Sequence, residues 1–132
     1  MKRVVDTNVL VSGLFNGGGS PGKLVDAILR GELTVVCSAA ILAEYRDVLT
    51  RRKFPFAPED VAALIEVIET AGDWVEPTPS RFALPDETDR VFIDAAKAAA
   101  CPVVTGNARH FPAEAGVEVL SPAACVERLL KA

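Results

Sequence analysis

The stretch that decides the fold is Arg3-Val4-Val5-Asp6-Thr7-Asn8, close to the N-terminus. Its β-branched run predicts a strand over residues 3–5 that ends at Asp6. A second apolar run, over residues 102–105, meets a similar polar stretch, Thr105-Gly106-Asn107. Ligands of an open parallel sheet bind beyond the carboxyl ends of its strands, so we expect a functional site where these two segments leave the sheet.

Short apolar runs alternate with longer helical patterns through the rest of the chain. We expect further strands at 33–37, 73–76, 102–105 and 117–120, and helices at 21–30, 38–52, 58–71, 86–100 and 122–130. Gly31 would end the first of these helices, Ser38 would cap the second and Pro58 would begin the third. This alternation predicts an α/β fold, a single three-layer α/β/α domain over residues 1–132 with a central, mainly parallel sheet.

The composition is that of a globular domain with excess negative charge. Hydrophobic residues make up 50% of the 132, and 14 basic against 18 acidic side chains give a net charge of −4. No apolar run approaches the ~20 residues of a membrane span, and the N-terminus lacks the apolar core of a signal peptide. We therefore expect a cytoplasmic protein with no membrane partner. The charge argues mildly against nucleic-acid binding, although bound cations would offset clustered carboxylates.

The cysteines give no sign of a metal site or a disulfide framework. Cys37, Cys101 and Cys125 are odd in number and stand at wide spacings beside apolar neighbours. We expect all three to be reduced and mostly buried.

Three acidic positions stand out, and each has an ordinary explanation beside a chemical one. Asp6 is flanked by apolar residues, where a buried carboxylate needs a partner or a metal, yet it could equally cap a following turn. Glu44 lies at the edge of the apolar stripe of its helix, where a solvated residue is usual. The segment Asp86-Glu87-Thr88-Asp89 begins a helix. Capping needs one or two of its three acids and leaves at least one for chemistry.

Four segments in order resemble those of the PIN-domain family, especially its prokaryotic VapC-like ribonucleases, the toxin components of type II toxin–antitoxin systems. They are residues 4–12, 38–49, 86–93 and 104–111. The resemblance implies that Asp6, Glu44 and Asp89 are catalytic and meet at the strand ends to hold Mg²⁺ or Mn²⁺. Asp86 competes with Asp89 for the third position. Asn107 would be a neutral fourth metal ligand, at a position where many relatives carry aspartate.

Other residues would support this site. Thr7, Asn8, Asp86 and Thr105 could orient metal ligands or water, although Thr7 and Thr105 could equally satisfy backbone groups at the strand ends. Arg46, Arg90 and Arg109 would contact RNA phosphates. The cations of residues 51–53 fit an ordinary solvated helix face equally well, and the single histidine, His110, is not expected to be catalytic.

The resemblance implies a metal-dependent endoribonuclease that hydrolyses RNA phosphodiester bonds. Its partners would be RNA, a cognate antitoxin protein and a second copy of the chain in a homodimer. The alternative is a PIN-fold interaction module, weak in catalysis, that acts through a protein partner. Binding of divalent metal distinguishes the two, because the nuclease requires it.

Overall fold

Five parallel strands form the central sheet of the computed structural model, which describes residues 1–131. The strands are β1 (Lys2–Val5), β2 (Thr34–Cys37), β3 (Asp73–Trp74), β4 (Val103–Val104) and β5 (Val119–Leu120). Their order across the sheet is β3-β2-β1-β4-β5. Each neighbouring pair is parallel. The chain therefore builds outward from β1 in both directions, and the direction changes between β1 and β4.

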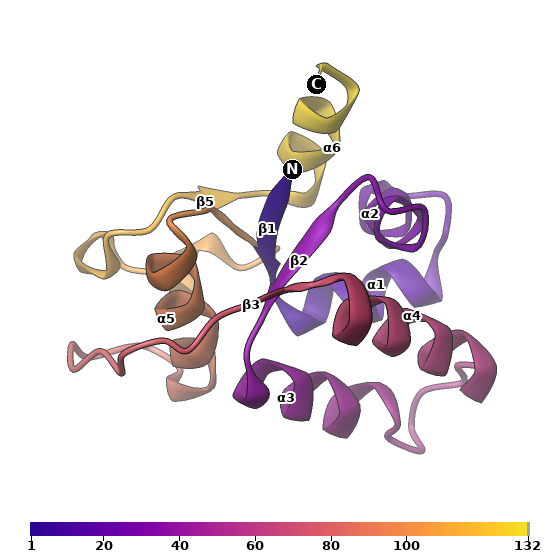
Figure 1. Ribbon diagram of the computed structural model, residues 1–132, viewed down its shortest axis with the longest axis horizontal. Coiled ribbons are helices and arrows are strands. Elements are labelled where there is room, and N and C mark those ends of the chain that lie inside the picture. The colour runs from indigo at the N-terminus through magenta and orange to yellow at the C-terminus, as the bar shows by residue number, and fades with distance from the viewer. Residues whose placement is uncertain (132) are drawn as a thin grey trace.

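Six α-helices flank the sheet and complete the expected three-layer α/β/α fold. They are α1 (Thr7–Phe15), α2 (Ser20–Leu29), α3 (Ala39–Leu49), α4 (Pro58–Ala71), α5 (Arg90–Ala99) and α6 (Pro122–Lys131). In Figure 1, α5 lies on one side of the strands, and α1, α2 and α4 lie on the other. Three short 3₁₀ helices, Glu87–Asp89, Ala108–His110 and Ala113–Ala115, lie in the connections.

Several predicted boundaries are confirmed in atomic detail. The Ser38 hydroxyl accepts a hydrogen bond from the backbone N–H of Ile41 and caps α3. Gly31 follows α2 with φ of 77°, a left-handed conformation that favours glycine. Pro58 stands at the beginning of α4. Other ends differ, since α3 stops at Leu49 rather than near residue 52, and β3 has only two residues.

The helix α1 has no counterpart among the predicted elements. Its run Val9-Leu10-Val11 is β-branched at two positions, so local propensity does not favour a helix. Burial decides the outcome. Val9 and Leu10 are buried, and Gly13 lets the backbone of α1 approach α2 closely. The helix begins directly after β1 and makes Asp6 its N-terminal flanking residue.

The core consists of the strand valines and the inner faces of the helices. Val4, Val5, Val103 and Val104 are completely buried. Tyr45 of α3 is also completely buried, and its hydroxyl donates a hydrogen bond to the carbonyl of Val5. All three cysteines are free thiols, as expected, and only Cys101 is partly exposed.

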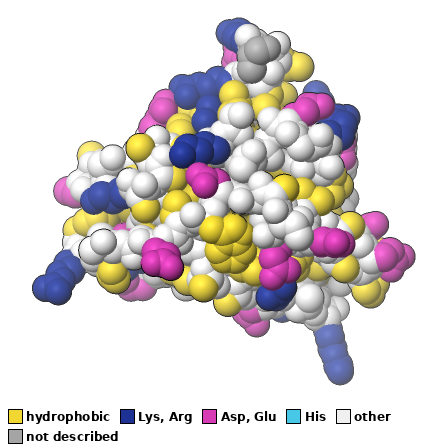
Figure 2. Space-filling view, viewed as in Figure 1, with side chains coloured by type: hydrophobic (Ala, Val, Ile, Leu, Met, Phe, Trp, Pro, Cys, Tyr) yellow, Lys and Arg dark blue, Asp and Glu magenta, His cyan; other side chains and the backbone are white. Residues whose placement is uncertain are grey.

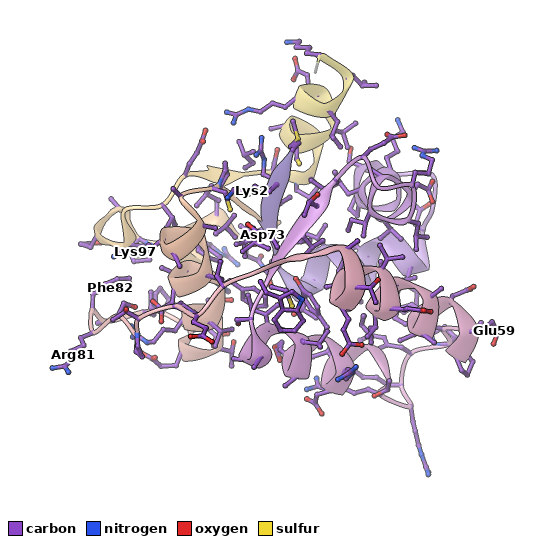
Figure 3. The ribbon with its side chains drawn as sticks, viewed as in Figure 1. Lys2, Glu59, Asp73, Arg81, Phe82 and Lys97 are labelled. Carbon is purple, nitrogen blue, oxygen red and sulfur yellow. The ribbon has the colours of Figure 1, made fainter. Side chains whose placement is uncertain are left out.

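An exposed ion pair lies near the opposite, amino-terminal ends of the strands. Lys2 of β1 and Asp73 of β3 form an ion pair at 3.3 Å (Figure 3). No helix within residues 1–131 is long and apolar enough to cross a membrane.

Candidate metal centre

The carboxyl ends of β1 and β4 meet at the point where the strand order changes direction, which is where open parallel sheets bind ligands. Asp6 and Thr105 come directly after these strands and are 95% and 99% buried. The hydroxyl of Thr105 donates to Asp6 Oδ2 at 2.7 Å and accepts from the backbone N–H of Asn107 at 3.0 Å. One threonine thus fixes both the Asp6 carboxylate and the turn that carries Asn107.

A cleft of about 300 Å³ opens above these strand ends. Its lining comes from the end of β1 and the beginning of α1, from α3 and the loop that follows it, from the segment before α5 and from the turn after β4. The residues are Asp6, Thr7, Asn8, Glu44, Val48, Arg51, Lys53, Phe54, Asp86, Thr88, Asp89, Asn107 and His110. Every predicted metal ligand is in this set, although the ligands span about one hundred positions of the chain.

The helix α3 presents Glu44 to the cleft. Its next residue, Tyr45, anchors the helix to the last carbonyl of β1, so the same strand end positions both Asp6 and Glu44. Glu44 is half-buried, and burial raises the pKa of its carboxyl group. The nearby Arg51 opposes this rise, while Asp6 and Asp86 add to it.

The three acids before α5 have three different surroundings. Asp86 Oδ1 accepts hydrogen bonds from the backbone N–H and the hydroxyl of Thr88, so Asp86 caps the 3₁₀ turn. Glu87 pairs with Arg90 at 2.7 Å. Asp89 is 93% buried, and its Oδ2 has no hydrogen-bond partner among the described residues. Capping thus accounts for Asp86 and pairing with Arg90 for Glu87, whereas Asp89 Oδ2 is buried with no hydrogen bond from the described residues.

The cleft disfavours negative charge and therefore favours a cation. Burial raises the pKa of Asp89 to about 6, and the charges of Asp6 and Asp86 contribute to the rise. Burial also raises the pKa of Asp6, with the Thr105 hydroxyl and the amides of Asn8 and Thr7 partly offsetting it. Carboxylates forced together in this way become more stable when a divalent cation neutralises them.

The donor set fits a hard divalent ion. Asp6, Glu44 and Asp89 offer carboxylate oxygens and Asn107 an amide oxygen, which are the ligands that Mg²⁺ and Mn²⁺ prefer. The strongest indication of a cation site is Asp89 Oδ2, which has no hydrogen bond from the described residues. A buried carboxylate oxygen without a hydrogen bond is costly unless a cation satisfies it. Asn107 brings no charge, so the set carries three negative charges when fully ionised.

The profile of the PIN domain family matches residues 2–109. This span contains every residue of the cleft lining except His110. The chain belongs to the PIN domain family.

Individual proteins are also similar to this chain in sequence or in fold. An uncharacterised protein of Methanocaldococcus jannaschii is 27% identical over 110 residues, which are 81% of this chain and 71% of that protein. The structure of VapBC2 from Rickettsia felis, bound to a DNA fragment from its promoter, contains a chain that matches with a TM-score of 0.56 and 14% identity. The match covers 92% of this chain and 98% of that one.

A domain of a functionally unknown Methanocaldococcus jannaschii protein matches with a TM-score of 0.54 and 22% identity. That match covers 91% of this chain and 89% of the other. At such identities the solved structures show a shared fold and nothing finer.

Three arginines proposed for RNA contact lie outside the lining of the PIN-domain cleft. Arg46 pairs with Glu69 at 3.2 Å and lines a larger, mostly apolar cavity of about 600 Å³ between α3 and α4. That cavity has no cluster of carboxylates at the strand ends, so we place the chemistry in the smaller cleft. Arg109 is exposed on the turn after β4.

Arg90 has a structural task. Its guanidinium donates to the carbonyls of Ser80 and Phe82 at 3.0 and 2.6 Å, and it also pairs with Glu87. The backbone N–H of Ser80 in turn donates to the buried Asp94. Figure 3 shows Phe82 beside α5, where Lys97 lies over its ring at 5.4 Å. These contacts hold the segment that leads to Asp86 against α5.

The cleft also contains residues for which the sequence predicted no clear role in the site. Arg51 and Lys53 line it and are its cationic side chains. His110 Nδ1 lies 3.5 Å from Asp89 Oδ2. Two features of the sequence could have pointed to His110: it is the only histidine, and it lies within the segment 104–111 that carries the family resemblance.

Proposed function

We propose that this PIN-domain chain is a divalent-metal-dependent endoribonuclease and the toxin component of a toxin–antitoxin pair. The observation that carries the proposal is the convergence of Asp6, Glu44 and Asp89 on one cleft, with the pKa of each carboxyl raised by burial. A site arranged in this way gains from binding a cation.

The side chains have separate tasks in this mechanism. Asp6, Glu44 and Asp89 would hold Mg²⁺ or Mn²⁺, and the amide oxygen of Asn107 would add a neutral ligand. When bound, the ion would activate water for attack and neutralise charge at the phosphate. Thr105 keeps Asp6 in place by its hydrogen bond of 2.7 Å.

Phosphate contact is best assigned to the rim of the cleft. Arg51 and Lys53 line the cleft and are exposed. They can bind the phosphates on either side of the scissile bond, which offsets the repulsion between RNA and a chain of net charge −4. Arg51 also pairs with Asp47 at 2.9 Å, an exposed contact that RNA phosphate can replace at little cost.

The toxin role and the partners rest on resemblance. The fold is shared with a chain of the VapBC2 structure, which supports an antitoxin protein as partner. A homodimer and a cytoplasmic location belong to the same proposal. The second candidate, an interaction module weak in catalysis, is favoured by one observation, the neutral Asn107 where an acid would strengthen metal binding.

RNA cleavage by the purified chain tests the proposal. With Mn²⁺ or Mg²⁺ present, we expect wild-type protein to cut RNA and Asp6→Asn, Glu44→Gln and Asp89→Asn to lose roughly 100-fold in rate, because each variant removes an anionic ligand. Asp26→Asn and Glu59→Gln change exposed acids outside the cleft and serve as matched controls. Equal rates in all six proteins would contradict the nuclease. Absence of metal binding at millimolar concentration would favour the interaction module.

A further inference from the structure

An imidazole lies among the carboxylates, and the proposed nuclease mechanism does not use it. Asp86, Asp89 and His110 each offer one ligand atom, and these atoms lie within 4.8 Å of one another. The ligands of one divalent transition ion stand about 2.0–2.2 Å from it and hence roughly 3–4.4 Å apart. The three side chains therefore need to close by at most roughly 1–1.5 Å to share an ion.

The central atom of this group lacks a partner. Asp89 Oδ2 is buried and accepts no hydrogen bond from the described residues, although His110 Nδ1 is 3.5 Å away. A hydrogen bond between such atoms would bring them to about 2.7–3.2 Å. Their longer separation leaves the carboxylate oxygen unsatisfied and aimed at the imidazole, which suits two ligands on either side of a cation.

The other two ligands are fixed by contacts outside the group. Both hydrogen bonds from Thr88 go to Asp86 Oδ1, which leaves Oδ2 free for another ligand. His110 ends the 3₁₀ turn after β4, and its backbone N–H donates to the carbonyl of Asn107 at 2.9 Å. The next residue, Phe111, is buried. The backbone therefore holds the imidazole beside Asp89 without any contribution from Asp89 itself.

From this geometry we infer that Asp86, Asp89 and His110 form a mixed nitrogen and oxygen site for a transition-metal ion of the Zn²⁺ class. Imidazole nitrogen favours such ions, whereas Mg²⁺ prefers oxygen ligands and water. The inference rests on the proposed function in one respect, because Asp89 is shared with the Mg²⁺ or Mn²⁺ site. Its consequence is that metal choice in this cleft is set by His110, a residue beyond the carboxylate set.

The single histidine makes a direct test available. In ¹⁵N-labelled full-length protein with millimolar Mg²⁺ present, titration with Zn²⁺ should move the ¹⁵Nδ1 resonance of His110 to the position of a metal-bound nitrogen and saturate at one ion per chain. Mg²⁺ alone should leave that resonance where it was. An imidazole resonance that does not move under saturating Zn²⁺ overturns the inference.

Variants add a thermodynamic readout. His110→Ala removes the imidazole nitrogen, so it should weaken Zn²⁺ binding by at least about tenfold and leave Mg²⁺ binding unchanged, as measured by calorimetry. Glu87→Gln is the matched control, since this neighbouring acid pairs with Arg90 and does not line the cleft. Equal weakening of Zn²⁺ and Mg²⁺ by His110→Ala would assign His110 a general structural role and overturn the inference.

The two proposals fail in different ways. If Zn²⁺ leaves His110 unaffected while Mg²⁺-dependent cleavage of RNA persists, the nuclease stands and the mixed site falls. If the His110 resonance responds to Zn²⁺ but no metal supports cleavage, the mixed site stands and the nuclease falls.

Discussion

Asp89 is the residue at which the stability of the fold and the proposed metal binding conflict. It is 93% buried, its Oδ2 has no hydrogen-bond partner among the described residues, and its pKa is raised to about 6 by burial and by the charges of Asp6 and Asp86. A carboxyl group in these surroundings destabilises the metal-free fold whenever it is ionised. Binding of a cation, as proposed for this cleft, would offset that cost.

The cost of Asp89 should depend on pH. Its pKa is higher in the folded chain than the ordinary 3.8, so the folded state binds the proton more tightly and metal-free stability falls as pH rises from about 4 through 6. Asp89→Asn should therefore stabilise the metal-free protein by about 2 kcal/mol at pH ~7.5 and by almost nothing at pH ~4.

Urea unfolding in the presence of a chelator measures this difference at the two pH values. Asp26→Asn, which changes an exposed acid on α2, should alter stability little at either pH. A stabilisation by Asp89→Asn that is equal at both pH values would show that ionisation is not its source.

At the scale of elements, α1 and the segment before α5 position the site. The first turn of α1 follows Asp6 directly, and close packing between α1 and α2 fixes the helix. On the other side of the cleft, Arg90 and Asp94 hold residues 80–82 against α5 and so define where the chain enters the turn of Asp86 and Asp89. Neither the packing of α1 on α2 nor the contacts of Arg90 and Asp94 involve the carboxylates that line the cleft.

The packing of α1 on α2 gives a prediction for Gly13. A Cβ added there would stand 2.6 Å from the carbonyl oxygen of Pro21 and 2.6 Å from Val25 Cγ2. Gly13→Ala should destabilise the chain by about 2 kcal/mol in urea unfolding, because this overlap outweighs the helix propensity of alanine. Gly17→Ala is the matched control, since nothing lies within 4 Å of its added Cβ. Equal stability of the two variants would contradict the close approach.

At the scale of the whole molecule, the chain has a net charge of −4, and four of its 18 acidic side chains, Asp6, Glu44, Asp86 and Asp89, line one cleft. Acidic and basic side chains are interspersed over the face shown in Figure 2. The cleft lining has four acids against two basic side chains, Arg51 and Lys53, so part of the negative charge is concentrated there. A cation bound in the cleft would reduce repulsion between these carboxylates in the folded state, which brings them together.

Divalent ions should consequently stabilise the fold. Binding to the folded state alone contributes about 2.7 kcal/mol when the ion is at about 100 times its Kd. Mg²⁺ or Mn²⁺ should raise the melting temperature by several degrees, whereas NaCl at equal ionic strength should have a much smaller effect. Asp6→Asn should abolish most of the divalent effect in calorimetric scans. An unchanged response in Asp6→Asn would place the stabilising ion elsewhere.

The sequence by itself determined the layers and many of the ends of elements. Alternation of β-branched runs with helical patterns is a local signal, and so are the caps at Ser38, Gly31 and Pro58, because each depends on residues a few positions apart. Asp6, Glu44 and Asp89 could be proposed from their family segments. Their convergence on one cleft could only be expected.

Only the tertiary structure decided the rest. Helix α1 forms because burial of Val9 and Leu10 overrides weak local propensity. The different surroundings of Asp86 and Asp89 could not be derived from sequence, because an acid that caps a turn and an acid that is buried without a hydrogen bond look alike until their neighbours are known. Thr105 and Asp6 are 99 positions apart, and His110 reaches Asp89 from another turn. These contacts depend on β1 and β4 lying side by side in the sheet, which local sequence patterns do not specify.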